Sequence, residues 1–212
     1  MKSPPLKSPK AQPSGEATEP PAPQKWRRRK GARPQEILAA AMAVFAEKGF
    51  SAARMEDVAA RAGVSKGTVY LYYTSKQDMF RALVREGITA NLRTGAEMVE
   101  RFDGSSAELL RLLLGAAVHA IQTSPLAAAP KIIISESGNF PEMAEFYRRE
   151  VIDVGLGLVM QIIRRGVERG EFRATGGEYA ARLFIAPVVL AALWKSCFDQ
   201  FDKTPFDAAS DN

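Results

Sequence analysis

Residues 45–80 read FAEKGFSAARMEDVAARAGVSKGTVYLYYTSKQDMF, and this stretch decides the fold. Two short helical patterns, at 55–62 and 65–72, flank a turn that begins at Gly63. A glycine there permits the positive φ that a chain reversal after a helix needs. Ser65 is suited to cap the second helix, because its hydroxyl accepts an N–H group of the first turn. The stretch therefore predicts a helix-turn-helix unit.

The second helix of such a unit is held at an angle that lets it enter a DNA major groove about 12 Å wide. Its exposed N–H groups and the positive end of its dipole favour a phosphate oxygen. Aromatic residues at helical spacing are more often core than surface, and we expect this of Tyr73 but not of Tyr70. The residues expected to contact phosphates or base edges are Ser65, Lys66, Gly67, Thr68, Tyr70 and Tyr72, with Lys76 at the start of the next helix.

Helical periodicity continues along the rest of the chain, and no alternating stretch is long enough to build a sheet. The predicted class is therefore all-α, with a three-helix DNA-binding domain followed by a larger helical domain. Helices are expected at 34–48, 55–62, 65–72, from Thr74 or Ser75 onward, at 105–123, 126–135, 141–169 and 176–201. The corresponding parts are a Pro-rich arm at 1–33, the DNA-binding domain at 34–80, an effector-binding and dimerisation domain at 81–205, and a tail at 206–212.

The N-terminal arm carries most of the positive charge. Residues 1–33 hold seven of the 13 prolines and nine Lys/Arg residues against two Glu residues, a composition typical of disorder. Residues 34–80 hold five residues of each sign. The basic block around Arg28 and Arg29 is either a solvated linker or an arm that lies along nucleic acid. In the second case the block supplies much of the salt-dependent affinity for DNA. Each phosphate neutralised then steepens the plot of log affinity against log salt concentration by about 0.9.

The last two predicted helices carry more apolar surface than one helix face needs. Residues 141–169 show two apolar stripes, and the helix at 176–201 is apolar nearly all round between Leu183 and Trp194. Such a helix is either central in the core or covered by a second copy, and we expect a homodimer through both helices. The apolar run of 12 residues is shorter than the roughly 20 that a membrane span needs. With no apolar leader at the N-terminus, the expected location is cytoplasmic, without a membrane partner.

An effector pocket is the least specific feature of the sequence. His119 and Gln122 lie in a long uncharged stretch, and Phe184 and Trp194 are candidates for the opposite wall of an apolar pocket with a few polar groups. The alternative for His119 is a core position. The turn at 135–137 is a gate or a simple loop.

Enzymatic chemistry has little support in the sequence. One histidine and one cysteine supply neither a metal-ligand cluster nor a nucleophile–base pair, and there is no Gly-rich phosphate loop. We therefore expect neither an enzyme nor a cofactor. The alternatives to a sequence-specific regulator are a generic nucleic-acid-binding module and a helical small-molecule-binding protein.

The stretch also resembles a known family. FAEKGF at 45–50, AGVSKGTVY at 62–70 and YYTSK at 72–76 are similar to the TetR family of bacterial transcriptional regulators. The segments EFYRREV and IIRRGVERGEF resemble effector domains of its AcrR-like branch. The resemblance implies a dimer that binds a palindromic operator through residues 65–76, pairs through its last two helices, and is released by a small effector, most commonly as a repressor.

Two positions depart from the family pattern. Arg54 stands where the family usually has a Thr or Ser that caps the second helix and bonds a phosphate. We expect the Arg54 guanidinium to reach the same phosphate. Leu71 replaces a common aromatic residue, which puts that contact in doubt.

Overall fold

The computed structural model describes residues 34–173 and 176–202, and over these ranges the chain forms helices and no strand. This confirms the all-α class. The α-helices are α1 (Pro34–Lys48), α2 (Met55–Ala62), α3 (Lys66–Tyr72), α4 (Lys76–Leu83), α5 (Ala90–Arg101), α6 (Ser106–Thr123), α7 (Ala129–Glu136), α8 (Pro141–Tyr147), α9 (Asp153–Glu168) and α10 (Gly177–Cys197). Two 3-10 turns are η2 (Pro125–Ala128) and η4 (Asp199–Phe201).

Two of the long helices contain a π-helical turn. The segment η1 (Val84–Thr89) joins α4 to α5 without a break, and η3 (Arg148–Ile152) joins α8 to α9. The two π-helical turns lie against each other, and Arg85 in η1 forms an ion pair of 3.4 Å with Glu150 in η3. The helix predicted at 141–169 is therefore continuous in space, with a local change of hydrogen bonding near its middle.

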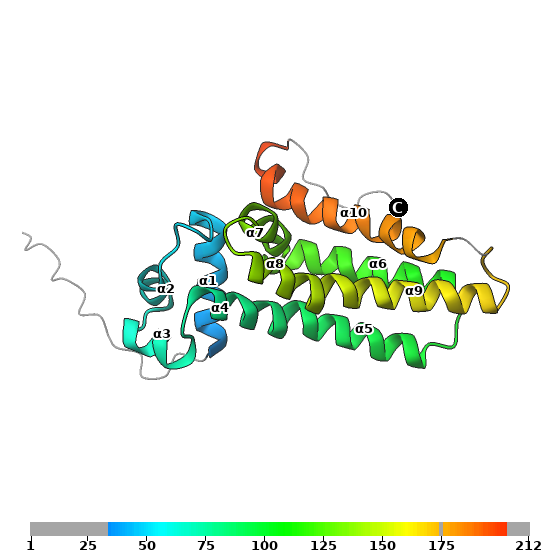
Figure 1. Cartoon of the computed structure of the whole chain (residues 1–212), viewed down its shortest axis with the longest axis horizontal. Coiled ribbons are helices and arrows are strands. Elements are labelled where there is room, and N and C mark those ends of the chain that lie inside the picture. Colours follow the sequence, from blue (N-terminus) through cyan, green and yellow to red (C-terminus); the bar gives the residue numbers. More distant parts are fainter. Residues whose placement is uncertain (1–33, 174–175, 203–212) are drawn as a thin grey trace, which may run out of the picture.

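The helices form two connected parts. Helices α1 to α4 gather at one end of the molecule, and α5, α6, α9 and α10 run side by side as an elongated bundle (Figure 1). Helices α7 and α8 lie at the junction, where α8 contacts α4 and α7 contacts α10 of the bundle. Any change in the bundle therefore reaches α1–α4 through this junction or along α4.

The core under α2 and α3 is built from the residues that the sequence indicated. Val58 and Val69 are fully buried. The Phe50 ring packs edge-to-face with the rings of Phe45 and Phe80, and the ring centres are 5.0 and 5.9 Å apart. The same cluster continues into α7 and α8 through Ala129, Ile132, Met143, Phe146 and Tyr147. The helix-turn-helix part thus shares its hydrophobic core with α7 and α8.

Helix α10 is only partly covered. Ala181 and Ala192 are its buried residues, whereas Leu183 and Leu190 are 74% and 61% exposed. The possibility that this helix is central in the core of one chain is therefore excluded. By length and mean hydropathy alone, 1.5 over an 18-residue window, α10 is long and apolar enough to cross a membrane, although its uninterrupted apolar run is shorter. Here it packs lengthwise on α9 and α6 (Figure 1).

Candidate nucleic-acid interface

The turn between α2 and α3 has the geometry that the sequence predicts. Gly63 has φ 68°, and its N–H group donates to the last turn of α2. Ser65 is the N-cap of α3, and its Oγ accepts the N–H group of Thr68 at 3.1 Å. The Thr68 hydroxyl lies 2.8 Å from the same Oγ. These bonds fix the angle between the two helices locally.

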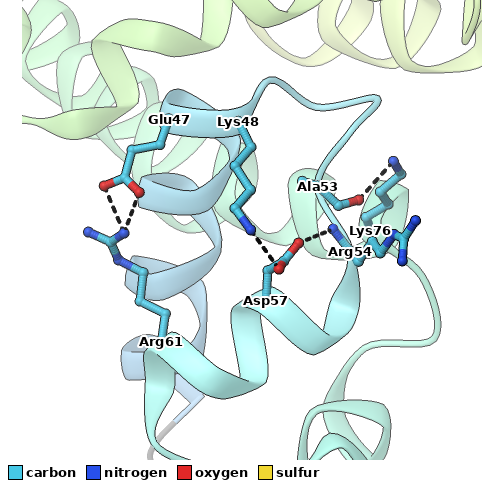
Figure 2. Close-up of polar contacts among 7 residues, drawn as sticks. All are labelled: Glu47, Lys48, Ala53, Arg54, Asp57, Arg61 and Lys76. Carbon is cyan, nitrogen blue, oxygen red and sulfur yellow. Dashed lines mark hydrogen bonds and ion pairs between the residues drawn. The ribbon is translucent and has the colours of Figure 1, made fainter.

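Helix α2 is braced against α1 by two ion pairs (Figure 2). Lys48 Nζ lies 2.7 Å from Asp57 Oδ1, and Arg61 Nη1 lies 2.6 Å from Glu47 Oε2. The Lys48 ammonium is the main cause of a lowered Asp57 pKa. The pairs bridge two helices through long side chains, so they fix the orientation of α2 more than they add stability.

Helix α2 begins without a side-chain cap from Arg54. The Asp57 carboxylate accepts the Arg54 backbone N–H at 3.0 Å, which is the reciprocal half of a capping box (Figure 2). The Asp57 N–H, which a Ser or Thr hydroxyl at residue 54 would accept, donates to the Arg54 backbone carbonyl at 3.1 Å instead. The exposed Arg54 side chain makes no capping hydrogen bond. Its guanidinium therefore takes no part in capping α2. The phosphate contact predicted for Arg54 needs a guanidinium that is not engaged in this way.

Helix α3 turns one face to the core and the rest to solvent. Val69 is fully buried and Tyr73 is 7% exposed, which confirms Tyr73 as a packing residue. Burial raises the pKa of Tyr73 to about 12. Tyr70 is 44% and Tyr72 is 47% exposed, so both hydroxyls are open to a partner. The most exposed side chain of the helix is Leu71, at 83%, which the sequence analysis did not place at the interface.

Lys66 is not a free cation in this structure. Its ammonium pairs with Glu56 of α2 and lies 5.7 Å from the centre of the Tyr70 ring. The Glu56 carboxylate raises the pKa of Lys66. All three side chains are exposed, so a phosphate approaching this surface competes with Glu56 for the same ammonium.

Lys76 occupies a different place from the one expected. Its Nζ donates to the backbone carbonyls of Phe50 at 2.7 Å, Ser51 at 2.7 Å and Ala53 at 3.1 Å. These bonds engage all three ammonium donors, and burial lowers the Lys76 pKa. The phosphate clamp predicted for Lys76 does not fit this geometry. The Lys76 side chain instead bonds to backbone carbonyls of the loop before α2 (Figure 2).

A buried carboxylate ties the same loop to α7. Glu136, 8% exposed, accepts the Ser51 N–H at 3.0 Å, the Ser51 hydroxyl at 2.6 Å and the Asn139 amide at 3.2 Å. The Ser51 hydroxyl is the main cause of the lowered Glu136 pKa. The Phe140 ring also packs edge-to-face with the Phe50 ring, and the two ring centres are 5.4 Å apart. Glu136, at the end of α7, thus joins α7 to the loop before α2, whereas the Ser135 and Ser137 hydroxyls bond to carbonyls within α7. Sequence spacing alone did not reveal this contact.

The four residues expected to form an effector pocket make separate contacts in the described part of the chain. His119 is exposed on α6, so it is not a core residue. Phe184 packs with Leu156 and Val159 of α9. Trp194 is 41% exposed and donates through Nε1 to Asp202 at 2.5 Å. The Gln122 carbonyl accepts from Lys195, which draws the end of α10 onto the end of α6.

A groove of a different character lies between α4–η1 and α8–η3. Its lining is charged, and the guanidinium groups of Arg81 and Arg85 lie 5.9 and 5.1 Å from the Phe146 ring centre. The lining residues are Asp78, Arg81, Arg85, Glu142, Glu145, Phe146 and Arg149. This groove could not be predicted from sequence spacing, because its residues come from helices far apart in the chain.

The predicted arm and tail lie outside the described residues. This applies to Arg28, Arg29 and the rest of the arm at 1–33, and to the tail at 206–212.

Both parts of the chain match family models. Residues 37–83 match the model of bacterial regulatory proteins of the tetR family. Residues 103–200 match the tetracyclin repressor-like C-terminal domain. The two matches cover the helix-turn-helix end and most of the helical bundle, in the order that the structure shows.

Known proteins with similar sequences or folds are regulators. The uncharacterized HTH-type transcriptional regulator YfiR of Bacillus subtilis strain 168 is 30% identical over 72% of this chain and 74% of its own length. The HTH-type transcriptional repressor LfrR of Mycolicibacterium smegmatis is 30% identical over 64% of this chain and 66% of its own. The solved structure of FadR from Bacillus subtilis in complex with stearoyl-CoA superposes with a TM-score of 0.67 at 22% identity, over 77% of this chain and 87% of FadR.

Proposed function

The chain belongs to the TetR family of bacterial DNA-binding transcription regulators, and from this premise we propose that it is a ligand-responsive dimeric repressor of palindromic operators. The observation that carries the proposal is α3: it is capped, held on a fully buried Val69, and open to solvent over its outer surface. A rigid helix with exposed hydroxyl, amine and apolar groups suits a major groove.

The DNA contacts follow from this surface. Ser65, Thr68, Tyr70 and Tyr72 offer hydroxyl groups, and Lys66 offers a charge once a phosphate displaces Glu56. Arg54 lies at the start of α2 with its guanidinium free of capping, in position to bond a phosphate beside the groove. The basic arm at 1–33, with Arg28 and Arg29, adds non-specific affinity, since residues 34–80 are balanced in charge.

A second copy completes the molecule. The outer face of α10 exposes large apolar residues along its whole length, and an apolar patch of this kind marks an interaction site. Pairing through this face and α9 produces a symmetric dimer with two copies of α3. Each copy then meets one half-site, and half-sites of such dimers lie about 34–36 Å apart. The same pairing buries the apolar side chains that α10 exposes in a single chain.

Release by an effector requires a coupling between the bundle and α2–α3. The shared core and the Glu136–Ser51 contact join the two parts directly. An effector that favours a different packing of the bundle shifts the population away from the DNA-binding arrangement. The relative LfrR is named a repressor, and the fold is one in which FadR holds stearoyl-CoA, so long-chain acyl-CoA is the first effector to assay.

Selection of bound duplexes from a random DNA pool tests the proposal. We expect a palindromic site bound at least about 10³-fold more tightly than random DNA at the same salt concentration. Equal affinity for every duplex would identify a generic nucleic-acid-binding module instead. Addition of stearoyl-CoA to the selected complex then tests the effector class, and an unchanged affinity would reject that class while leaving the operator result intact.

A further inference from the structure

The part of α3 that faces directly away from the core carries no hydrogen-bonding side chain. Successive residues of an α-helix are about 100° apart, so Gly67 and Leu71 each lie about 160° from the buried Val69, on either side of the point that faces directly away from the core. Lys66 and Tyr70 lie to one side of this part. Polar groups therefore flank the centre of the surface without occupying it.

Gly67 has no internal reason to be a glycine. A Cβ atom added there would meet only Ser65 Oγ, at an ordinary 3.8 Å, and its φ is not in the left-handed region. Glycine inside a helix costs about 1 kcal/mol relative to alanine. The bare backbone at Gly67 lies one helical turn before Leu71. It lets a partner approach α3 closely from outside.

Leu71 is the most exposed large apolar side chain in the described part of the molecule, at 83%. Its neighbours Tyr70 and Tyr72 leave it projecting between two half-exposed rings. A leucine at the centre of a DNA-binding surface can form only apolar contacts. In the major groove, the apolar group that a base pair presents is the 5-methyl group of thymine.

We propose that Leu71 is a specificity-determining residue that recognises the 5-methyl group of a thymine in each half-site. The inference rests on the proposed operator binding and deepens it. Close approach at Gly67 brings α3 deep into the groove, and the Leu71 methyl groups then cover the thymine methyl group. Each half-site therefore contains a thymine whose methyl group, rather than its hydrogen-bonding edge, is read.

The test replaces thymidine by deoxyuridine, which removes the methyl group and leaves base pairing intact. Burial of one such carbon is worth about 0.8 kcal/mol, which is about fourfold in affinity. With the full-length protein and its selected operator, each thymidine is replaced in turn in both half-sites. We expect one symmetric pair to weaken binding by about 16-fold, the product of two fourfold effects.

The matching protein variants are Leu71→Ala and, as a control, Leu112→Ala, which removes the same atoms from an exposed leucine on α6. Leu71→Ala should bind the thymidine and deoxyuridine operators equally, with unchanged thermal unfolding. Leu112→Ala should keep the wild-type difference. Deoxyuridine that has no effect at any position, or that weakens Leu71→Ala as much as wild type, would overturn the inference while operator binding stands. A selection without any preferred sequence would overturn operator binding, and this inference with it.

Discussion

The Ser51 hydroxyl donates to Glu136 Oε2 at 2.6 Å, although the two residues are 85 positions apart in the chain. Ser51 lies in the loop that leads into α2, and Glu136 ends α7. The loop is held from its other side by Lys76, whose charge also helps to lower the Glu136 pKa. The placement of α2 thus depends on a carboxylate from the opposite part of the molecule.

Replacing this carboxylate should destabilise the protein in a pH-dependent way. The Glu136 pKa lies below its ordinary value of 4.5 in the folded protein, so its ionised form contributes stability above that pH and loses the contribution as the pH falls through the folded pKa. We expect Glu136→Gln to lower the unfolding free energy by about 1–3 kcal/mol at pH 7. The difference from wild type should shrink below pH 4.5 in denaturant titrations. A difference that is constant with pH would contradict the assigned role.

Lys76→Met separates a structural lysine from a DNA-contacting one. The variant loses three hydrogen bonds to the loop at 50–53 and keeps the length of the side chain, so we expect a clear loss of unfolding free energy, about 1–3 kcal/mol. The slope of log affinity against log salt should stay the same. A slope lower by about 0.9 for each subunit would instead assign Lys76 to a phosphate.

Glu56→Gln should strengthen DNA binding. Glu56 holds the Lys66 ammonium in the free protein and adds a negative charge beside the proposed phosphate contact. Its removal frees the lysine, so affinity should rise several-fold in a fluorescence titration. Lys66→Ala should weaken binding and reduce the salt slope by about 0.9 per subunit, with unchanged thermal unfolding. Glu100→Gln is the matched control, since it removes an exposed carboxylate from α5, and it should leave the affinity unchanged.

Deletion of residues 1–30 tests the contribution of the arm. The segment contains a run of four basic residues at 27–30. If these residues lie along the duplex, their loss should flatten the salt slope by about two or more units per dimer and reduce affinity for random DNA most. An unchanged slope would assign the segment to a linker without DNA contacts.

Charge placed on the outer face of α10 should prevent pairing. Leu183 and Leu190 are largely exposed on this face, whereas Ala181 on the opposite side is fully buried. We expect the double variant Leu183→Asp and Leu190→Asp to sediment as a monomer and to lose operator affinity, while retaining its helical content. Leu112→Asp on α6 should leave the sedimentation coefficient unchanged. A wild-type protein that sediments as a monomer would contradict the proposed pairing.

Local rules were enough to predict the helix-turn-helix. Gly63 and Ser65 act on their immediate neighbours, so their conformations follow from residue type and position, and Ser75 caps α4 for the same reason. The burial of Tyr73 follows from its alignment with Val69 on one helix face. These features needed no information from distant parts of the chain.

Sequence reasoning is weakest for contacts between distant segments. The position of Lys76 at the start of α4 suggests a phosphate clamp, but the carbonyls that bind its ammonium belong to a loop more than 20 positions earlier. The proposed pocket around His119 and Trp194 depended on how α6 and α10 pack, which periodicity does not specify. Glu136 and Ser51 were missed because neither residue belongs to a motif.

The continuous core across α1–α4, α7 and α8 limits how this protein can be divided. A fragment ending after α4 would leave Phe50 without Phe140 and would strip Ile132 and Met143 from the cluster. Helices α1–α4 therefore do not form an independent folding unit that could be transferred alone to another protein. A chimaera that keeps the helix-turn-helix end should therefore carry the native chain through Tyr147, the last residue of the shared cluster that α8 contributes.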